Sequence, residues 1–495
     1  MPPPPKISFE KFLCPAVSRW YPLCLVGTRW VPLNTTSDLV RCHTQAPRWP
    51  VMDSDDHAML EALVRHGKRH QLDDFLAQGD RCGWCRHPIR LRGFVVSGSA
   101  GEETVTFSSS SLPDGVVLKA CGSRSEVRCP SCAAIYRGDS RHLVRAGLEG
   151  GKGVDEAIAL HPAVFLTLTA PSFGAVHATS AVSPCHAGHP RARCAHGRPL
   201  ACPRRHERGD ELVGTPLCPD CYDYEGAVLQ NALNSELWRR TMIYTERQLA
   251  AVLDRPQADA RRVVRLSFCR VAEFQRRGVV HLHAIVRADG PEGSVPPVDA
   301  GQLARACLQA AGTITVSNPN ASATWGRQID VQVLEHGDER ARRVATYVAK
   351  YATKTSSDDP RLDAPVRSFE DLCRRELPTH LHRMVATALD LGADPALSEL
   401  NLARHAHRLG YGGHFLTKSR RYSTTFGALR DARVQWREAR RLGDDGPAGH
   451  SSEGHWHAVG AGWTDRGESL FAAHQQRQRT EDKREAELAW YTRSE

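Results

Sequence analysis

The stretch that decides the expected fold is Val279–Val286, which reads Val-Val-His-Leu-His-Ala-Ile-Val. Its two histidines alternate with apolar residues, and this pattern predicts a β-strand that carries both imidazoles on one face. Residues 263–274 are also strand-like, and Gln-Arg-Arg-Gly at residues 275–278 has the composition of a turn. We therefore expect a β-hairpin with His281 and His283 on its second strand.

A second stretch, Tyr347–Lys354, reads Tyr-Val-Ala-Lys-Tyr-Ala-Thr-Lys and follows the helix-favouring residues 339–346. A helix over residues 339–355 would align four of its side chains at i, i+3, i+4 and i+7. These are Tyr347, Lys350, Tyr351 and Lys354. Such a stripe is normally apolar and buried, whereas this one carries two phenols and two ammonium groups.

The histidine pair is suited to hold a divalent metal ion, although two histidines rarely complete a site. Glu273 lies across the expected hairpin from the histidine strand, close enough to converge with it, and Gln275 is the reserve for a third ligand. Two histidines and one carboxylate also match the facial triad of iron oxygenases. That alternative leaves the tyrosines, the lysines and the cysteine pairs of the chain without a role.

The tyrosine stripe suggests nucleophilic catalysis once a phenol is activated, because its ordinary pKa of about 10 leaves it protonated. A metal can polarise phosphoryl oxygens, a tyrosine can attack, and a lysine can neutralise the charge that develops. Together these groups favour transesterification of a phosphodiester. We therefore expect DNA nicking through a covalent phosphotyrosine.

Three motifs in this order resemble those of the HUH endonucleases. His281-Leu282-His283 is similar to their His-hydrophobe-His signature, and Tyr347–Tyr351 resembles the two-tyrosine motif of rolling-circle replication initiators. Phe165–Thr169 resembles the strand motif that lies upstream in that family. The resemblance extends over roughly residues 80–425 and is to replication initiators of actinobacterial plasmids and integrative elements.

The resemblance implies a central antiparallel sheet, a catalytic Mn²⁺ or Mg²⁺ ion on His281, His283 and Glu273, and nicking of single-stranded or origin DNA. The product would be a 5′-phosphotyrosine and a free 3′-OH for a host polymerase. Tyr347 and Tyr351 can each fill either tyrosine role. The chain has no Walker-type phosphate loop, so a host helicase is expected as a partner.

Two other functions remain open. A two-tyrosine transposase also combines cysteine knuckles with an HUH site, and a zinc-dependent DNA-binding regulator would need no catalysis. A conjugative relaxase fits less well, because that group usually has its tyrosine upstream of a three-histidine cluster. A metal-dependent covalent adduct would separate the two enzymes from the regulator.

Sixteen cysteines, several in Cys-x-x-Cys pairs, favour zinc over disulfides, and two structural zinc ions are expected. A first zinc-ribbon-like module would use two knuckles separated by strands, with Cys121 as a packed thiol. Its expected ligands are Cys82, Cys85, Cys129 and Cys132.

A second module lies in a segment rich in cysteine and histidine. Its expected ligands are Cys194, Cys202, Cys218 and Cys221, with Cys185 and His206 as substitutes. A zinc deaminase is excluded, because His206 and Glu207 are adjacent and Pro216 is separated from Cys218, so both spacings of that motif are missed.

The order strand, helix, hairpin, helix, strand, helix predicts an α+β fold with a mainly antiparallel sheet covered by helices. We expect an ill-defined extension over residues 1–55 and a helix plus zinc-ribbon module over 56–145. The HUH endonuclease domain would span 158–358, with a zinc-binding insertion at about 183–224. A mainly helical, basic region would occupy 365–495.

The composition fits a soluble protein of the cytoplasm, since no apolar run approaches the length that spans a membrane. The formal net charge of +9 permits nucleic-acid binding without requiring it. Arginine dominates the basic residues and often occurs in pairs, which are commonly solvated helix faces. The pairs are Arg204–Arg205, Arg239–Arg240, Arg261–Arg262 and Arg420–Arg421.

Overall fold

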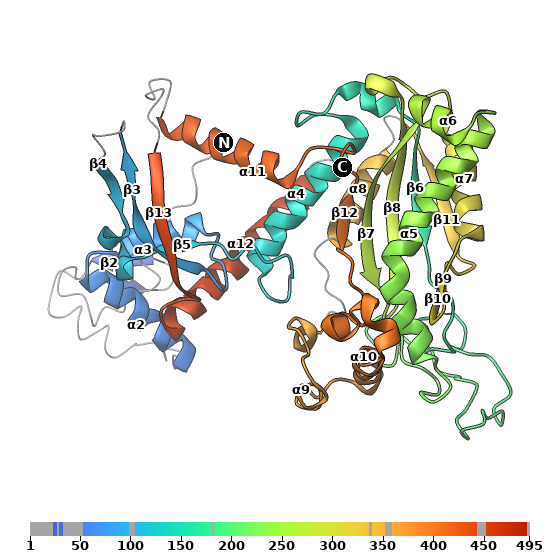
Figure 1. Ribbon diagram of the computed structural model, residues 1–495. Helices are drawn as coiled ribbons and strands as arrows, with labels where there is room; N and C mark the ends of the chain where they lie inside the picture. The colour runs from blue at the N-terminus through green and yellow to red at the C-terminus, as the bar shows by residue number, and fades with distance from the viewer. Residues whose placement is uncertain are drawn as a thin grey trace. The chain divides into compact units, whose positions relative to one another are not determined.

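The computed structural model describes residues 53–98, 104–180, 182–335, 339–351, 359–442 and 452–492, together with a short hairpin of β1 (Leu23–Val26) and β2 (Arg29–Pro32). The chain divides into two compact units (Figure 1). Unit 1 comprises Met1–Ala120 and His450–Glu495, and unit 2 comprises Cys121–Gly449.

Unit 2 is built on a five-stranded sheet in the order β11-β6-β8-β7-β12, in which every neighbouring pair is antiparallel. Its strands are β6 (Ala163–Leu168), β7 (Arg265–Phe274), β8 (Val280–Asp289), β11 (Ile329–Leu334) and β12 (Leu416–Lys418). The hairpin predicted from the histidine stretch is formed by β7 and β8. The structure therefore confirms a mixed α/β fold with antiparallel sheets.

One face of this sheet is covered by α5 (Tyr224–Val252) and α7 (Ala300–Thr313), which contact each other (Figure 1). Side chains such as Leu237, Leu282 and Val286 fill the core on this face. The hairpin of β9 (Thr315–Asn318) and β10 (Ala321–Thr324) packs on α5, and α6 (Gln257–Val263) connects α5 to β7. Burial of the apolar side chains between the sheet and these helices stabilises the fold, because it removes apolar surface from water.

The opposite face is covered by α8 (Glu339–Tyr351), which contacts β7 and α4 (Pro130–Glu149). Val344, Ala345 and Val348 of α8 are buried against Phe165 and Ile285 of the sheet. This apolar side fixes the helix on the sheet, while Lys350 is exposed and Tyr347, at 37% exposure, lies at the edge of the contact. Unit 2 also contains α9 (Phe369–Cys373), α10 (Thr379–Leu391) and α11 (Phe426–Leu442).

Unit 1 contains two helices, α2 (Ser54–Lys68) and α3 (Leu72–Arg81), in the region where the sequence predicts a helix ahead of the zinc-ribbon module. The Asp53 carboxylate caps α2, because it accepts hydrogen bonds from the backbone N–H groups of Asp55 and Asp56. The helix breaks at His70, whose φ of 55° is left-handed. A continuous helix cannot pass through that conformation.

The sheet of unit 1 contains β13 (Ser452–Ala461), β3 (Ile89–Ser97) and β4 (Thr104–Ser108), with β5 (Val117–Lys119) also pairing with β3. Within residues 365–495, which the sequence predicts to be mainly helical, β13 is a strand that the sequence did not predict, and it pairs antiparallel with β3. It is followed by α12 (Arg466–Thr492), which packs on α2. None of the helices in the described ranges is both long and apolar enough to span a membrane.

Candidate active site and metal-binding groups

Strand β8 presents the two predicted histidines on one face, with ring centroids 4.5 Å apart. Each ring is held through Nδ1 by a threonine hydroxyl of the β6 region. The distances are 3.1 Å from His281 to Thr169 Oγ1 and 3.2 Å from His283 to Thr167 Oγ1. A hydroxyl that accepts the Nδ1 proton leaves Nε2 with its lone pair, which is the form that binds metals.

Glu273 is directly opposite His281 in the β7–β8 register, as predicted. Its Oε2 lies 3.6 Å from His283 Nε2. The ligand atoms of His281, His283 and Glu273 do not all lie within 4.8 Å of one another, unlike those of three other groups among the described residues. The Tyr347 hydroxyl of the predicted tyrosine helix lies 3.1 Å from the same His283 nitrogen.

Burial is the main cause that lowers the pKa of His281 to about 4, and the nearby His283 acts in the same direction. The imidazole is therefore neutral at physiological pH, as a metal ligand must be. Burial also raises the pKa of Tyr347, and a hydrogen bond with Tyr351 acts in the same direction. The Tyr347 phenol is therefore protonated and requires activation before it can attack.

The two tyrosines lie together beside the histidines, as predicted from their spacing. Their ring centroids are 4.6 Å apart, and the Tyr351 ring lies 5.7 Å from that of His283. Lys350 is exposed, and its Nζ lies 5.9 Å from the centroid of the Tyr351 ring. Lys354, the fourth member of the stripe, lies outside the described residues. One cluster therefore holds two imidazoles, a carboxylate and two phenols.

The hairpin turn beside this cluster is fixed by buried polar contacts. Asn231 of α5 donates to the Gly278 carbonyl at 2.8 Å and accepts from the Val280 N–H at 2.8 Å. The Arg277 carbonyl accepts from the hydroxyl of Tyr222 at 3.1 Å and lies 3.0 Å from His380 Nε2. These contacts fix the ends of β7 and β8, where Glu273 and His281 are placed.

Thr167 and Thr169 belong to the upstream strand motif, which does not by itself predict a role for them. Their roles depend on the pairing of β6 with β8, in which Thr167 is opposite His283. Phe165 of the same motif stacks its ring on that of His283, at 5.7 Å between centroids. The alternation of Phe165, Thr167 and Thr169 along the strand is the signal that indicates one shared face.

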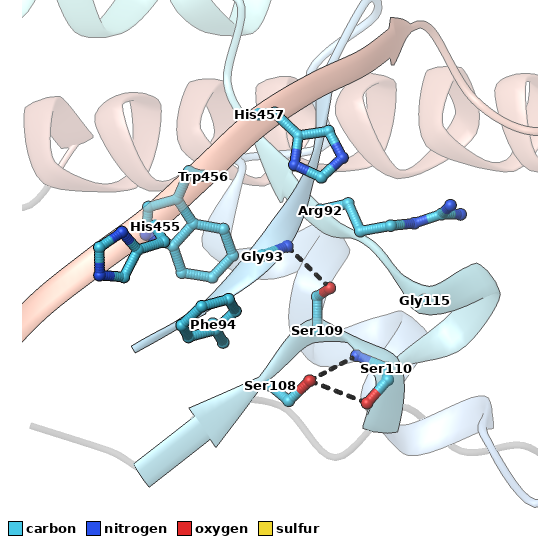
Figure 2. Close-up of a pocket in the computed structure, with 10 residues that line it drawn as sticks. All are labelled: Arg92, Gly93, Phe94, Ser108, Ser109, Ser110, Gly115, His455, Trp456 and His457. Carbon is cyan, nitrogen blue, oxygen red and sulfur yellow. Dashed lines mark hydrogen bonds between the residues drawn. The ribbon is translucent and has the colours of Figure 1, made fainter. Parts of the chain in front are cut away.

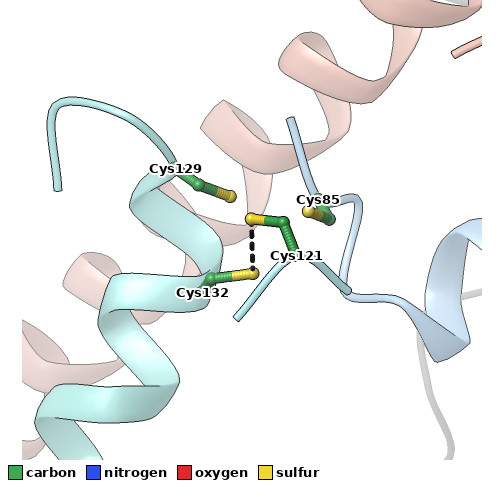
Figure 3. A group of neighbouring side chains, drawn as sticks. All are labelled: Cys85, Cys121, Cys129 and Cys132. Carbon is green, nitrogen blue, oxygen red and sulfur yellow. Dashed lines mark hydrogen bonds between the residues drawn. The ribbon is translucent and has the colours of Figure 1, made fainter. Parts of the chain in front are cut away.

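The first cysteine group differs from the predicted ligand set at one position. Cys85, Cys121, Cys129 and Cys132 bring their sulfur atoms within 4.8 Å of one another (Figure 3). Cys121, predicted to be a packed thiol, takes the place of Cys82. The Cys82 thiol donates instead to the Gly79 carbonyl at 3.4 Å, because Cys82 ends α3 with its side chain turned toward that helix.

The cysteine-rich insertion contains two groups where the sequence predicts one. Cys194, Cys218 and Cys221 lie together as predicted, but their fourth member is His196. Cys202 belongs to the other group, made of His177, Cys185, Cys202 and His206. The pairing of His186 with Cys202 separates Cys202 from the first set. The substitutes Cys185 and His206 therefore both belong with Cys202.

The chemistry of both insertion groups fits zinc, which binds thiolates and imidazoles in sets of four. His206 Nδ1 lies 2.6 Å from the Asp210 carboxylate, and this pairing raises the pKa of His206. Such a carboxylate orients an imidazole whose other nitrogen binds a metal. Together with the first cysteine group, the described residues offer three four-ligand groups, whereas the sequence predicts two zinc ions.

Unit 1 has a cavity of about 690 Å³ on its sheet (Figure 2). It is lined by side chains of β3 and β13, including Arg92, Phe94, His455 and His457. The Phe94 and His455 rings lie 5.1 Å apart, and the Ser109 hydroxyl accepts from the Gly93 N–H at 3.1 Å. No residue of the histidine and tyrosine cluster lines this cavity.

The family model described as "RepSA: Replication initiator protein, pSAM2" matches residues 71–477 of the chain. A replication initiator protein of Streptomyces ambofaciens is 37% identical over 418 residues, which cover 79% of this chain and 87% of that relative. No solved structure matches the chain. The matched residues include the five-stranded sheet, the tyrosine helix and the cysteine-rich insertion.

Proposed function

We propose, starting from the fact that this chain belongs to the RepSA family of replication initiator proteins, that it nicks one strand of origin DNA by tyrosine transesterification. The observation that carries this proposal is the position of the Tyr347 hydroxyl, 3.1 Å from His283 Nε2. A nucleophile, an imidazole pair and a carboxylate are thereby gathered at one end of the sheet. The family favours an initiator over a transposase or a regulator.

The residues at this site fit a divalent ion. Threonine hydroxyls hold Nδ1 of both histidines, which leaves Nε2 of each for a metal, and Glu273 supplies a carboxylate. Mn²⁺ and Mg²⁺ suit this mixed set, and the imidazoles favour Mn²⁺. When bound, the ion would polarise the non-bridging oxygens of the scissile phosphate.

The chain's own residues account for the bond changes. The Tyr347 oxygen attacks phosphorus in line and loses its proton to solvent. The bond from phosphorus to the 3′ oxygen breaks, and that oxygen takes up a proton. The products are a 5′-phosphotyrosine and a 3′-OH that a host polymerase can extend after a host helicase unwinds the strands.

Lys350 and Tyr351 support later steps in this proposal. The Lys350 ammonium, 5.9 Å from the Tyr351 ring, can neutralise charge that develops on a phosphate at the second tyrosine. Tyr351 can attack the junction regenerated after one round of synthesis, because it lies one helical turn from Tyr347. The ester energy is kept in the covalent link, so rejoining requires no nucleotide triphosphate.

The test is a nicking assay with Mn²⁺ on single-stranded oligonucleotides from the protein's own replicon, in which the covalent adduct is detected by gel shift under denaturing conditions. Tyr347→Phe is expected to lose more adduct than Tyr351→Phe, because the Tyr347 hydroxyl is the one beside His283. The double variant should lose at least about a thousandfold in rate. Full adduct formation by the double variant would exclude the tyrosine mechanism.

We also propose that the three cysteine-containing groups hold structural zinc. Each offers four ligands of the type that zinc prefers, and two of the groups lie in the insertion that precedes α5. The Gly214 region of this insertion packs against Arg276 of the hairpin turn, and the Arg276 guanidinium donates to the Asp210 carbonyl at 2.9 Å. Zinc in the insertion would therefore stabilise the loops that support the catalytic hairpin.

A further inference from the structure

A second cavity, of about 660 Å³, lies in unit 2 at the Arg265 end of β7, the end away from Glu273. Its lining is dominated by arginines from two separate segments. Arg261 and Arg262 of α6 and Arg265 of β7 form one side, and Ser419, Arg420 and Arg421 of the loop after β12 form the other. Two of the arginine pairs noted in the sequence, which are far apart in the chain, therefore meet at one cavity.

The positive charge of this cavity is only partly compensated. Glu246 also lines it and pairs with Arg261 at 2.6 Å. Arg262 lies 3.9 Å from Asp259, a long contact between strongly exposed side chains. Within the described part of the chain, no ion pair joins a carboxylate to Arg265, Arg420 or Arg421. Five guanidinium groups and one carboxylate thus line the cavity, which favours an anionic ligand.

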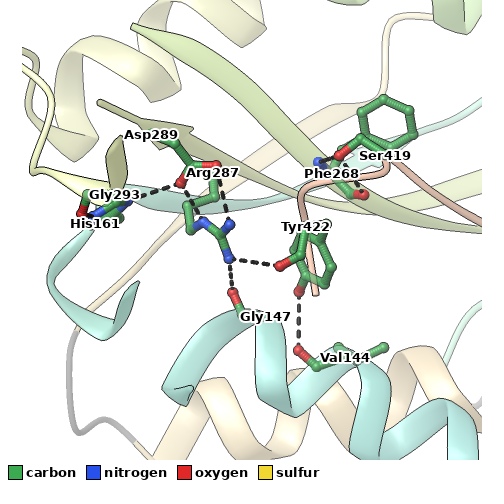
Figure 4. A network of polar contacts seen from close by, with 9 residues as sticks. All are labelled: Val144, Gly147, His161, Phe268, Arg287, Asp289, Gly293, Ser419 and Tyr422. Carbon is green, nitrogen blue, oxygen red and sulfur yellow. Dashed lines mark hydrogen bonds and ion pairs between the residues drawn. The ribbon is translucent and has the colours of Figure 1, made fainter. Parts of the chain in front are cut away.

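The loop that carries Arg420 and Arg421 is fixed on the sheet before any ligand binds. The Ser419 N–H donates to the Phe268 carbonyl at 2.8 Å, and the Phe268 N–H donates to the Ser419 hydroxyl at 2.9 Å (Figure 4). On the other side of the pair, Tyr422 is fully buried, and its hydroxyl donates to the Val144 carbonyl at 3.1 Å.

A buried ion pair completes this support. Arg287 donates to the Tyr422 carbonyl at 3.1 Å and to the Asp289 carboxylate at 2.6 Å, and His161 lies 2.9 Å from the same carboxylate (Figure 4). Lys418 uses its ammonium on nearby backbone carbonyls, at 3.0 Å for that of Ser423. These charges therefore hold the loop, whereas Arg420 and Arg421 are exposed. A prearranged loop binds a ligand at a lower entropic cost.

Arg265 and Glu273 stand near opposite ends of β7, eight residues apart. The eight-residue separation corresponds to roughly 26 Å at about 3.3 Å per residue. We propose that the five arginines bind the phosphodiester backbone of DNA at a point roughly 26 Å from the scissile phosphate, an assignment that rests on the nicking function proposed above.

Guanidinium groups suit this ligand because their planar donors match two phosphate oxygens at once. The arginines reach the backbone and read no base, so they would set the register of the DNA on the protein. The rest of the cavity offers the Ser419 hydroxyl, which is a donor to phosphate as well.

The test compares the wild type with Arg420→Gln/Arg421→Gln in salt-dependent binding, measured by fluorescence anisotropy on labelled single-stranded oligonucleotides from the replicon. On single strands each lost phosphate contact lowers the slope of log K against log salt by roughly 0.7, so the slope should fall by about 1.4. At 0.15 M salt this corresponds to a loss of roughly 14-fold in affinity. The matched control is Arg477→Gln/Arg484→Gln on α12, which removes the same charge from exposed positions.

Oligonucleotide length sharpens the test. Fragments too short to reach from the nick to the arginines should bind both proteins alike, and longer fragments on one side of the nick should separate them. Equal slopes for the wild type and the loop variant on long fragments would overturn the proposal. An equal loss in the control variant would also overturn it.

The same preparations separate this proposal from the nicking function on which it rests. The loop variant should still form the covalent adduct on short fragments, because Arg420 and Arg421 lie away from the tyrosines. If the wild type forms no adduct, the nicking function fails even where the slope change is observed. If the adduct forms and the slopes are equal, the arginine assignment fails alone.

Discussion

Replacing Thr169 by valine should weaken metal binding at the catalytic cluster without disturbing the packing around it. Valine has nearly the shape of threonine and lacks only the hydroxyl, and Thr169 is buried at 8% exposure. That hydroxyl lies 3.1 Å from His281 Nδ1 and is its hydrogen-bond partner. Without it, the ring is free to rotate and to place its proton on Nε2, the nitrogen needed for the metal.

The loss of such a supporting hydrogen bond typically costs 10- to 100-fold in metal affinity. At about 1.36 kcal/mol per factor of ten, this corresponds to roughly 1.4–2.7 kcal/mol. The assay is a titration of Mn²⁺ in the nicking reaction, in which the concentration for half-maximal adduct formation should rise by that factor. Saturating Mn²⁺ should restore most of the rate, because the tyrosines are unchanged.

Two variants control this prediction. Thr169→Ser keeps the hydroxyl and should remain close to the wild type. Thr245→Val removes a buried hydroxyl from α5, where it donates to the Thr241 carbonyl at 2.9 Å, and should leave the Mn²⁺ requirement unchanged. An unchanged Mn²⁺ requirement in Thr169→Val, alongside a lost adduct in His281→Ala, would refute the reasoning that Thr169 orients the ring.

Three further predictions follow from the other parts of the structure. Elemental analysis should show that Cys202→Ala and Cys218→Ala each lose one zinc ion and that the double variant loses two. Loss of only one ion by the double variant would contradict two separate sites and support the single site predicted from the sequence. Burial alone would raise the pKa of Asp289, but hydrogen bonding to Arg287 lowers it below the ordinary 3.8. The ionised Asp289 therefore contributes stability above pH 3.8, and this contribution is lost as the pH falls through the lowered pKa. The free energy of unfolding in urea should depend less on pH in Asp289→Asn than in the wild type, and equal dependence would contradict this. Phe75→Ala should destabilise unit 1 by about 3–5 kcal/mol, measured by chemical unfolding, because this ring is 3% exposed and packs on Trp84, and a change below about 1 kcal/mol would contradict it.

Local patterns were sufficient to predict the central part of unit 2. The alternation around His281 predicts a strand, the turn residues predict the hairpin, and the pairing of Glu273 with His281 then follows from the short connection. The 3.6-residue period likewise predicts the helix that carries Tyr347. Each of these features depends on residues that are close in sequence, so the sequence carries the necessary information.

The parts that were not predicted depend on contacts between distant residues. The first cysteine group includes Cys121 rather than Cys82, although Cys82 belongs to a Cys-x-x-Cys pair and Cys121 does not, so spacing alone favours the wrong residue. Cys202 joins His177 through pairing between loops that have no periodic pattern. The threonine that orients each histidine is set by the register of β6 against β8, more than a hundred residues away.

The pairing of β13 with β3 has a consequence for the order in which the protein can fold during translation. Residues 121–449, which form unit 2, are synthesised before residues 452–461. One edge of strand β3 therefore stays unpaired until more than three hundred further residues have been synthesised. An open strand edge is a template for association with other chains, so nascent unit 1 is the part of this protein most dependent on chaperones.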